Sequence, residues 1–327
     1  MKSLRRLLLA LLPVGLSLCP YFGYAQQSYP SRPIRLLVPY PPGGPTDVLA
    51  RSLAAAFFER TAQPFVVENR PGANTNISTE ACARAPADGY TICMIATPLS
   101  LNPFLYATMP FDAEKDLDPI TNLVFAPEVL ITSATVPVNS IQELVSYSKA
   151  HPGKLNYASF GQGGTPHLVL EWLKKQTGAE LTHIPFKGAA QAVPALVTGE
   201  IHAIYLAVGT PGVIAQVKTG KIKALLASGN RRNPLLPEAP TFAEAGLPDL
   251  GARVWFGLAA PAGTPKHMVQ KLSTDVSAII QSQGFSERLA GLGFEPVGNT
   301  AEEFARFLAQ DRVRGANLVR ISGARLE

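Results

Sequence analysis

The chain has 327 residues, of which 46% are apolar and 16% charged, and its 29 basic and 24 acidic side chains give a formal net charge of +5. This length is more than one hydrophobic core usually serves, so we expect two lobes. No block of Lys and Arg with interleaved aromatic residues occurs in the sequence. We therefore do not expect a nucleic-acid partner.

The first 25 residues have the three parts of a secretory signal peptide. Three basic side chains precede an apolar run over 7–18, and small residues follow up to Ala25. The run is shorter than the roughly 20 residues that span a bilayer, so we expect cleavage and export to the periplasm rather than a retained anchor. A lipid anchor on Cys19 is the alternative, which the preceding Leu18 disfavours. Three of the 29 basic residues lie in this leader, which leaves 26 basic against 24 acidic residues in the mature chain.

Cys82 and Cys93 are the two cysteines that remain after such cleavage. In an oxidising compartment an even pair can form a disulfide. Two small buried thiols are the alternative, and the sequence leaves both open.

Short apolar strands alternate with amphipathic helices along the mature chain. In the first half of the chain we expect, in order, a strand over 34–38, a helix over 48–60, a strand over 64–68, a helix over 77–84, and strands over 90–96 and 129–132. We then expect a helix over 141–150, a strand over 155–159, a helix over 166–177, strands over 181–185 and 201–206, a helix over 211–218, and strands over 222–228 and 254–259. The end is helical: one helix is capped by Thr264 with Pro265 at its first position, and a last helix is opened by the capping box of Thr300 and Glu303. The stretch between Asn102 and 129 has no clear period. This alternation predicts an α/β fold with mostly parallel sheets and helices outside.

The first candidate ligand site is the junction YPPGGPTD, which joins a strand to a helix. Its candidate residues are Tyr40, Pro42, Gly43, Gly44, Pro45, Thr46 and Asp47. Two glycines let the backbone approach a ligand, and Asp47 can cap the helix. The first turn of a helix offers unpaired N–H groups and a positive dipole end, which suit an anion without any Lys or Arg. A tight turn before a capped helix is the alternative.

Two further strand ends carry similar residues. The segment SFGQGGTPH contributes Ser159, Phe160, Gly161, Gly163, Gly164, Thr165 as a helix cap, and His167; the segment ATPLS contributes Thr97, Leu99 and Ser100. The first of these segments lacks the third glycine and downstream acid of a dinucleotide site and the GK[ST] ending of a P-loop. Ligands of open α/β sheets bind outside the carboxyl ends of strands, so the three junctions can converge on one cleft.

Enzyme signatures are absent from the sequence. It has no GxSxG, no HExxH and no paired Cys motif, and the histidines at 151, 167, 183, 202 and 267 have no metal-ligand spacing. Lys187 can neutralise an anion or pair at the surface. We therefore expect a binding protein without catalysis, cofactor or metal; a secreted hydrolase is the alternative from another class.

At this point the motifs are recognisable. The sequence carries, in order, PSRPIRLLVPYPPGGPTD, VVENRPGANTNI, ADGYTI, DLDPIT, HPGKLNYASFGQGGTPH, PFKGAAQA, PEAPTFAEAGLPDL and WFGLAAPAGTP. Over essentially the whole mature chain it resembles the Bug family, the substrate-binding proteins of tripartite tricarboxylate transporters in Gram-negative bacteria.

The resemblance implies a type II periplasmic binding fold, in which two lobes joined by crossing strands close on a small carboxylate. We place the crossings near Ile131 and Arg253, so that lobe 1 comprises 26–130 plus 253–327 and lobe 2 comprises 131–252. The implied function is delivery of the solute, by a monomer, to membrane transporter subunits. Presentation of the ligand to a sensor kinase is the alternative.

The resemblance also implies where the carboxylate is held. Residues 40 and 42–47, with 97–100 beside them, would form the grip of lobe 1, and 159–167 that of lobe 2; Lys187, Tyr205 and Val208 complete the expected site. Two segments depart from the family pattern. Residues 72–76 read GANTN where relatives often have GAGGN, and His202 and Leu206 replace acids that can pair with a ligand amino group. The second departure favours a plain or aromatic carboxylate over an amino acid.

Overall fold

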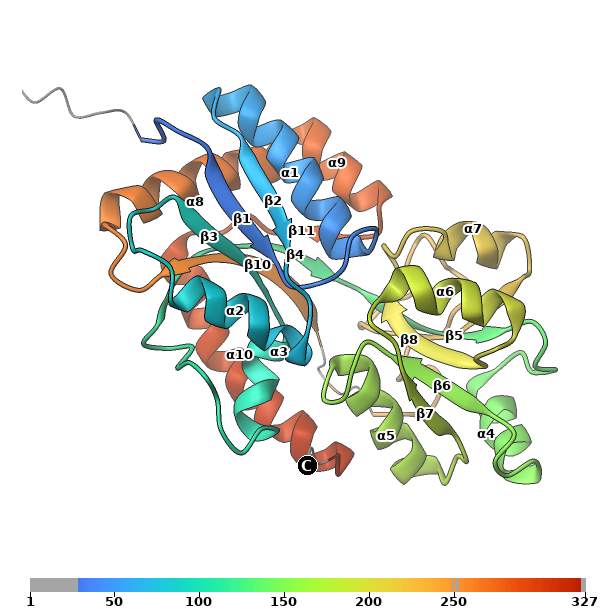
Figure 1. The fold of residues 1–327 in the computed structure, drawn as a ribbon. Helices are drawn as coiled ribbons and strands as arrows, with labels where there is room; N and C mark the ends of the chain where they lie inside the picture. Colours follow the sequence, from blue (N-terminus) through green and yellow to red (C-terminus); the bar gives the residue numbers. More distant parts are fainter. Residues whose placement is uncertain (1–28, 249, 251–252, 325–327) are drawn as a thin grey trace, which may run out of the picture.

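The computed structural model describes residues 29–248, 250 and 253–324. It has two lobes, each built on one β-sheet with helices on both faces (Figure 1). The expected signal peptide lies outside the described residues. Within them, no helix has the length and apolar character needed to cross a membrane.

Lobe 1 holds the six-stranded sheet, in the order β11-β4-β10-β3-β1-β2. Its elements are β1 (Ile34–Val38), α1 (Pro45–Thr61), β2 (Phe65–Asn69), η1 (Ala73–Thr75), α2 (Asn76–Ala83), β3 (Thr91–Ala96), α3 (Pro98–Leu101), η2 (Asn102–Phe104), β4 (Leu117–Ala126), β10 (Val254–Pro261), α8 (Lys266–Gln281), α9 (Gln283–Gly291), β11 (Glu295–Pro296) and α10 (Ala301–Ser322). Side chains of β1 alternate between the two faces, since Leu36 packs into the core with α1 and α8 and Leu37 into the core with Trp255. A disulfide joins Cys82 of α2 to Cys93 of β3, with the Cα atoms 5.9 Å apart.

Lobe 2 holds the five-stranded sheet, in the order β7-β6-β8-β5-β9. Its elements are β5 (Glu128–Ser133), α4 (Ile141–Ala150), β6 (Asn156–Ser159), α5 (Thr165–Thr177), β7 (Thr182–Pro185), α6 (Ala189–Thr198), β8 (Ala203–Ala207), α7 (Val213–Lys218) and β9 (Ile222–Ala227). Here too alternate residues face opposite cores: Leu130 and Tyr205 pack on one side, Val129 and Ile204 on the other.

The chain passes from the first sheet to the second at Pro127, since β4 ends at Ala126 and β5 begins at Glu128. This crossing in the sheets lies four residues before Ile131, where the resemblance placed it. The chain returns between β9 and β10.

The sheets are mixed rather than mostly parallel, which corrects the expectation from strand–helix alternation. β10 runs antiparallel to both β3 and β4, and β5 runs antiparallel to both β8 and β9. Each of these strands enters its sheet from the other lobe, so its direction is set by the crossing and not by a βαβ unit.

The sequence patterns placed most elements within a few residues but missed seven of them: the short η1, α3, η2 and β11, and the longer β4, α6 and α9. β4 is hidden by Asp118-Pro119 at its start, α6 contains Pro194, and α9 follows α8 after a single residue. The capping box of α10 is present as predicted: Glu303 N donates to Thr300 Oγ1 at 3.2 Å and Thr300 N donates to the Glu303 carboxylate at 3.0 Å.

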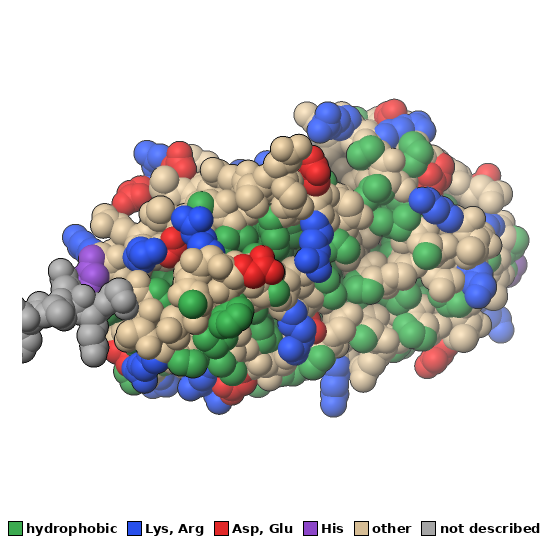
Figure 2. Space-filling view, turned by 90° about the horizontal axis from the view of Figure 1, so that it is seen from above, with side chains coloured by type: hydrophobic (Ala, Val, Ile, Leu, Met, Phe, Trp, Pro, Cys, Tyr) green, Lys and Arg blue, Asp and Glu red, His purple; other side chains and the backbone are tan. Residues whose placement is uncertain are grey.

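Helix α10 belongs to lobe 1 but also packs against α5 of lobe 2. Lys175 Nζ donates to Ile321 O at 3.2 Å across this contact. On the face that Figure 2 shows, Lys and Arg side chains are interspersed with Asp and Glu rather than gathered in one patch.

Candidate functional site

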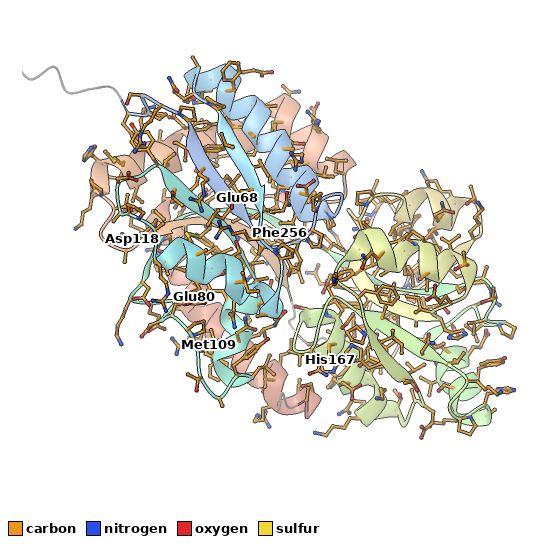
Figure 3. All side chains as sticks on the ribbon, viewed as in Figure 1. Glu68, Glu80, Met109, Asp118, His167 and Phe256 are labelled. Atoms are coloured by element: carbon orange, nitrogen blue, oxygen red, sulfur yellow. A yellow bond between two sulfur atoms is a disulfide. The ribbon has the colours of Figure 1, made fainter. Side chains whose placement is uncertain are left out.

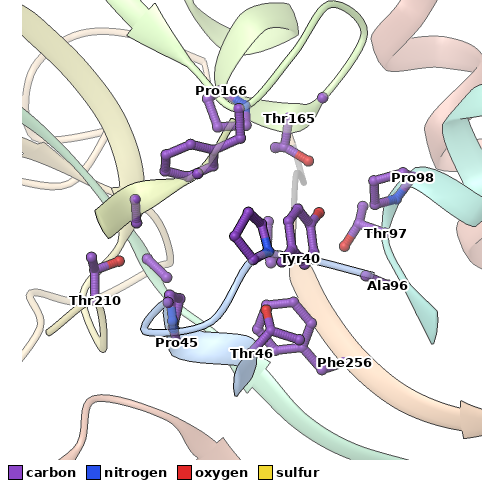
Figure 4. Close-up of a pocket in the computed structure, with 18 of the residues that line it drawn as sticks. Tyr40, Pro45, Thr46, Ala96, Thr97, Pro98, Thr165, Pro166, Thr210 and Phe256 are labelled. Carbon is purple, nitrogen blue, oxygen red and sulfur yellow. The ribbon is translucent and has the colours of Figure 1, made fainter. Parts of the chain in front are cut away.

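A pocket of about 740 Å³, part of it open to solvent, lies between the two lobes. Figure 4 shows Tyr40 and Thr46 of lobe 1 facing Thr165 and Thr210 of lobe 2 across it. Most of its wall is apolar, formed by prolines, alanines and aromatic rings. The lining residues are Tyr40, Pro41, Pro42, Gly44, Pro45, Thr46, Asn74, Ala96, Thr97, Pro98, Glu128, Phe160, Gly164, Thr165, Pro166, Gly188, Ala189, Ala190, Ala207, Thr210, Val254 and Phe256.

The first Gly-rich junction is held in place by hydrogen bonds to the Asp47 carboxylate. Helix α1 begins at Pro45 with Gly44 as its N-cap, so Asp47 is not the cap that the sequence predicted. Instead its carboxylate accepts bonds from Gly43 N at 3.1 Å, Arg51 Nε at 3.0 Å and Asn69 Nδ2 at 3.0 Å. Burial opposes ionisation of Asp47, but these three donors outweigh it and hold its pKa below the usual value. Asp47 therefore shapes the loop and does not line the pocket.

The second Gly-rich junction is held by the neighbouring imidazoles of His167 and His183. Helix α5 begins at Thr165 with Gly164 as N-cap, one residue earlier than expected. His167 Nδ1 accepts a bond from Gly163 N at 3.1 Å, and the His167 and His183 rings lie 4.4 Å apart. Figure 3 labels His167 in lobe 2. His183 Nε2 lies 2.6 Å from the Ser159 hydroxyl at the end of β6. The same hydroxyl accepts a hydrogen bond from Gly161 N at 3.2 Å.

Both imidazoles are neutral at neutral pH. Burial lowers the pKa of His167, and burial together with the neighbouring His167 lowers the pKa of His183 to about 4. The two rings thus position the loop without adding positive charge to it.

A third helix start, which the sequence did not predict, also reaches the pocket. Gly188 is the N-cap of α6, and Ala189 and Ala190 line the wall beside it. The amide N–H groups at the starts of α1, α5 and α6 have no acceptor among the described residues; they belong to Thr46, Asp47, Thr165, His167, Ala189 and Ala190. Three positive helix ends and their unpaired donors therefore converge on one pocket.

The lobes approach closely across this pocket. A Cβ atom at Gly164 would lie 3.4 Å from Asn74 Oδ1, and one at Gly188 would lie 3.3 Å from the Pro41 ring. Asn74 has a φ of 47° and is held by Asn102, whose Oδ1 accepts from Asn74 Nδ2 at 2.7 Å. The segment 72–76, which departs from the family pattern, thus forms part of the wall.

The structure brings nine of the predicted site residues into the pocket wall and places eleven elsewhere. Those in the wall are Tyr40, Pro42, Gly44, Pro45, Thr46, Thr97, Phe160, Gly164 and Thr165. Those outside it are Gly43, Asp47, Leu99, Ser100, Ser159, Gly161, Gly163, His167, Lys187, Tyr205 and Val208. Leu99 and Ser100 line a separate hollow against α10, Tyr205 and Val208 lie in the cores, and Lys187 is exposed.

The departures at 202 and 206 do not touch the pocket. Asn156 N donates to His202 Nδ1 at 3.1 Å, and Leu206 lies in the core on the α6 side of the sheet. Among the residues that sequence reasoning missed, the rule that ligands bind at strand ends could have found Ala207, which ends β8, and Thr210, which follows it. No pattern pointed to Glu128, because it lies at the start of a strand.

Glu128 is the one acidic residue among the described lining residues, and none of these is a Lys, Arg or His. Burial raises its pKa well above the usual value for a glutamate. The pocket therefore offers an anion backbone and hydroxyl donors instead of a cationic side chain.

Comparisons with known proteins agree with this geometry. The model of the tripartite tricarboxylate transporter family receptor matches residues 49–323. Protein BugT of Bordetella pertussis is 35% identical over 302 residues, which is 92% of each chain. An R. palustris protein solved with adipate is 34% identical, with a TM-score of 0.86 over 91% of this chain and all of that one. MatC of Rhodopseudomonas palustris, solved with bound malate, is 28% identical, with a TM-score of 0.81 over 89% of this chain and all of that one.

These likenesses extend over nearly the whole described chain and include both lobes around the pocket. Each solved relative has the periplasmic binding fold that the motifs implied. The chain therefore belongs to the tripartite tricarboxylate transporter receptor family of solute-binding proteins, the Bug family.

Proposed function

We propose that this chain is exported to the periplasm, captures a small carboxylate between its two lobes, and delivers it to the membrane subunits of a tripartite tricarboxylate transporter. The observation that carries the proposal is the convergence of three helix starts on a pocket without a cationic side chain among its described lining residues. Such donors suit the delocalised charge of a carboxylate. The adipate and malate bound by two relatives are ligands of this class.

The wall of the pocket indicates how the rest of the ligand is held. Pro41, Pro45 and Pro166 line it together with the rings of Phe160 and Phe256. An apolar wall of this kind packs against the carbon skeleton of a ligand, while a few polar groups orient its charge. We expect the lobes to separate for entry and to close on the ligand, with the crossing at Pro127 as a hinge.

A thermal-shift screen of the mature protein against a panel of carboxylates, with adipate and malate included, tests the proposal. A ligand present at 100 times its Kd should stabilise the protein by about 2.7 kcal/mol. Isothermal titration would then give the affinity of each carboxylate that raises the melting temperature. If neutral sugars or cations stabilise the protein and no carboxylate does, the proposal is wrong.

A further inference from the structure

Two further polar side chains, Glu128 and Thr210, line the pocket together with the helix starts. Glu128 is the first residue of β5 and lies opposite Ala207 of β8. Thr210 N donates to Ala207 O at 3.0 Å, so both residues sit at the same end of the sheet. The backbone of Glu128 is fixed by Ser228, whose Oγ accepts from Glu128 N at 2.8 Å. Figure 4 shows the side chain of Thr210 beside the pocket.

Both side chains are buried with a polar atom unpaired. Glu128 is 3% exposed and Thr210 is 4% exposed. Glu128 Oε2 and Thr210 Oγ1 have no hydrogen-bond partner among the described residues, and no ion pair reaches Glu128 there. A buried polar group without a partner costs about 1–3 kcal/mol. Two such groups in one pocket indicate a ligand whose polar atoms form hydrogen bonds with both.

Among the described residues, no Lys, Arg or His lines the pocket beside this carboxyl group. The titratable groups of the loops and strands packed around it are the phenols of Tyr40 and Tyr205, the second of which lies in the core on the α5 side. Lys223 of β9 is opposite Thr132 and donates to Val138 O at 2.9 Å, at the far end of the strand.

Of the other charged side chains near the pocket, Lys187 and Arg231 are exposed, form no ion pair among the described residues and do not line the pocket. Arg253 beyond the crossing pairs with Glu295 at 3.2 Å. The carboxylate of Asp47, on the first-lobe loop, is paired with Arg51. Helix α6 and the stretch of β10 that lines the pocket contribute no charged side chain. Burial without a counter-charge favours the neutral form of Glu128, whose pKa is raised for this reason.

We propose that Glu128 is the charge-selecting residue of this pocket: in its neutral form it donates a hydrogen bond to the bound carboxylate, and Thr210 donates a second one. This inference rests on the proposed function and names Glu128 and Thr210 as side chains that contact the ligand. A neutral carboxyl beside a carboxylate forms a strong O–H···O⁻ bond, whereas two carboxylates there would repel each other. Anion binding therefore requires the proton on Glu128 and holds it more tightly than the empty pocket does.

The consequence is a coupling between affinity and pH. While Glu128 is neutral in the empty protein, affinity is independent of pH. Above the pKa of Glu128 in the empty protein, Glu128 must take up one proton for each ligand that binds. In that range Kd rises by up to about tenfold per pH unit.

The test is isothermal titration with adipate and malate from about pH 5 to about pH 9 on four full-length mature proteins. These are the wild type, Glu128→Gln, Thr210→Val and the control Glu287→Gln, which changes an exposed glutamate of α9. We expect Kd of the wild type and of the control to rise with pH. Glu128→Gln, whose amide donates at every pH, should keep the low-pH affinity and lose the pH dependence. Thr210→Val should bind more weakly at every pH and keep the dependence.

Infrared difference spectra of the wild type and Glu128→Gln read the protonation of Glu128 without any ligand. A protonated carboxyl band that is present in the wild type and missing in the variant is expected. Three results would overturn the inference: an ionised Glu128 in the spectra of the ligand-free protein at neutral pH, loss of binding in Glu128→Gln, or a wild-type Kd that stays constant above the pH at which the spectra show Glu128 losing its proton. Loss of binding in Glu128→Gln, together with wild-type affinity that rises with pH, would mean that the ionised carboxylate of Glu128 accepts a hydrogen bond from the ligand instead of donating one. Failure of every carboxylate to bind any of the four proteins would overturn the proposed function itself.

Discussion

Substitution of Gly44 by valine tests the role of the first junction directly. Gly44 has φ −85° and ψ 173°, a conformation open to any residue, and an added Cβ would meet Pro41 O at 3.9 Å and no other neighbouring atom more closely. The larger side chain would therefore project into the pocket without backbone strain. As the N-cap of α1, Gly44→Val should cost about 1 kcal/mol of stability or less.

The expected loss of binding is larger than that cost. A valine at Gly44 would separate the ligand from the free N–H group of Thr46, which lines the pocket. A hydrogen bond to a charged group contributes about 1.5–3 kcal/mol, which corresponds to a loss of about ten- to a hundredfold in affinity. Isothermal titration with the carboxylate found in the screen measures this loss, and a thermal melt without ligand shows that the variant is folded.

Gly43→Ala is the matched control in the same loop. Gly43 has a φ of 84°, which costs about 1–2 kcal/mol for a residue with a Cβ, but it does not line the pocket. We expect this variant to melt earlier and to keep most of its affinity. Unchanged affinity in Gly44→Val, or an equal loss in both variants, would refute the assignment of α1 to the ligand site.

Two further predictions concern stability. Removing the disulfide with Cys82→Ala and Cys93→Ala together should lower the free energy of unfolding by about 3 kcal/mol, because the bridge closes a loop with a sequence separation of 11. Thermal melts of the oxidised wild type and of the double variant measure this loss, and equal melting midpoints would contradict the prediction. The pKa of His183 is about 4 in the folded protein, below the usual value of 6.5 for a histidine. His183 is therefore neutral in both states above about pH 6.5, and between pH 6.5 and 4 only the unfolded chain binds its proton. Stability should therefore fall as pH drops from 6.5 to 4, and less steeply in His183→Gln; parallel pH profiles of the two melting temperatures would contradict this.

Local sequence determined the parts of this protein whose signals are local. The alternation of β1, the helix at 141–150 and the capping box at Thr300 depend on neighbouring residues, and their positions could be predicted closely. The same holds for the two Gly-rich junctions, since glycines and prolines mark where a strand turns into a helix. β4 could not be recognised, because its Asp-Pro start and its polar Thr121 and Asn122 gain their places only by pairing with β10.

Tertiary structure decided which of these junctions share a pocket and what charge they meet there. The antiparallel entry of β5 brings Glu128 opposite Ala207, although 79 positions separate them in sequence, and no local pattern encodes that contact. The approach of the lobes sets the start of α6 beside the loop at 41–47, whereas packing within lobe 1 places Leu99 and Ser100 against α10. The sequence by itself determined that strand ends with free backbone donors exist. Only the crossing of the chain between two sheets decided that three helix starts and one buried glutamate line the same pocket. The reason is that burial and charge depend on residues that are distant along the chain.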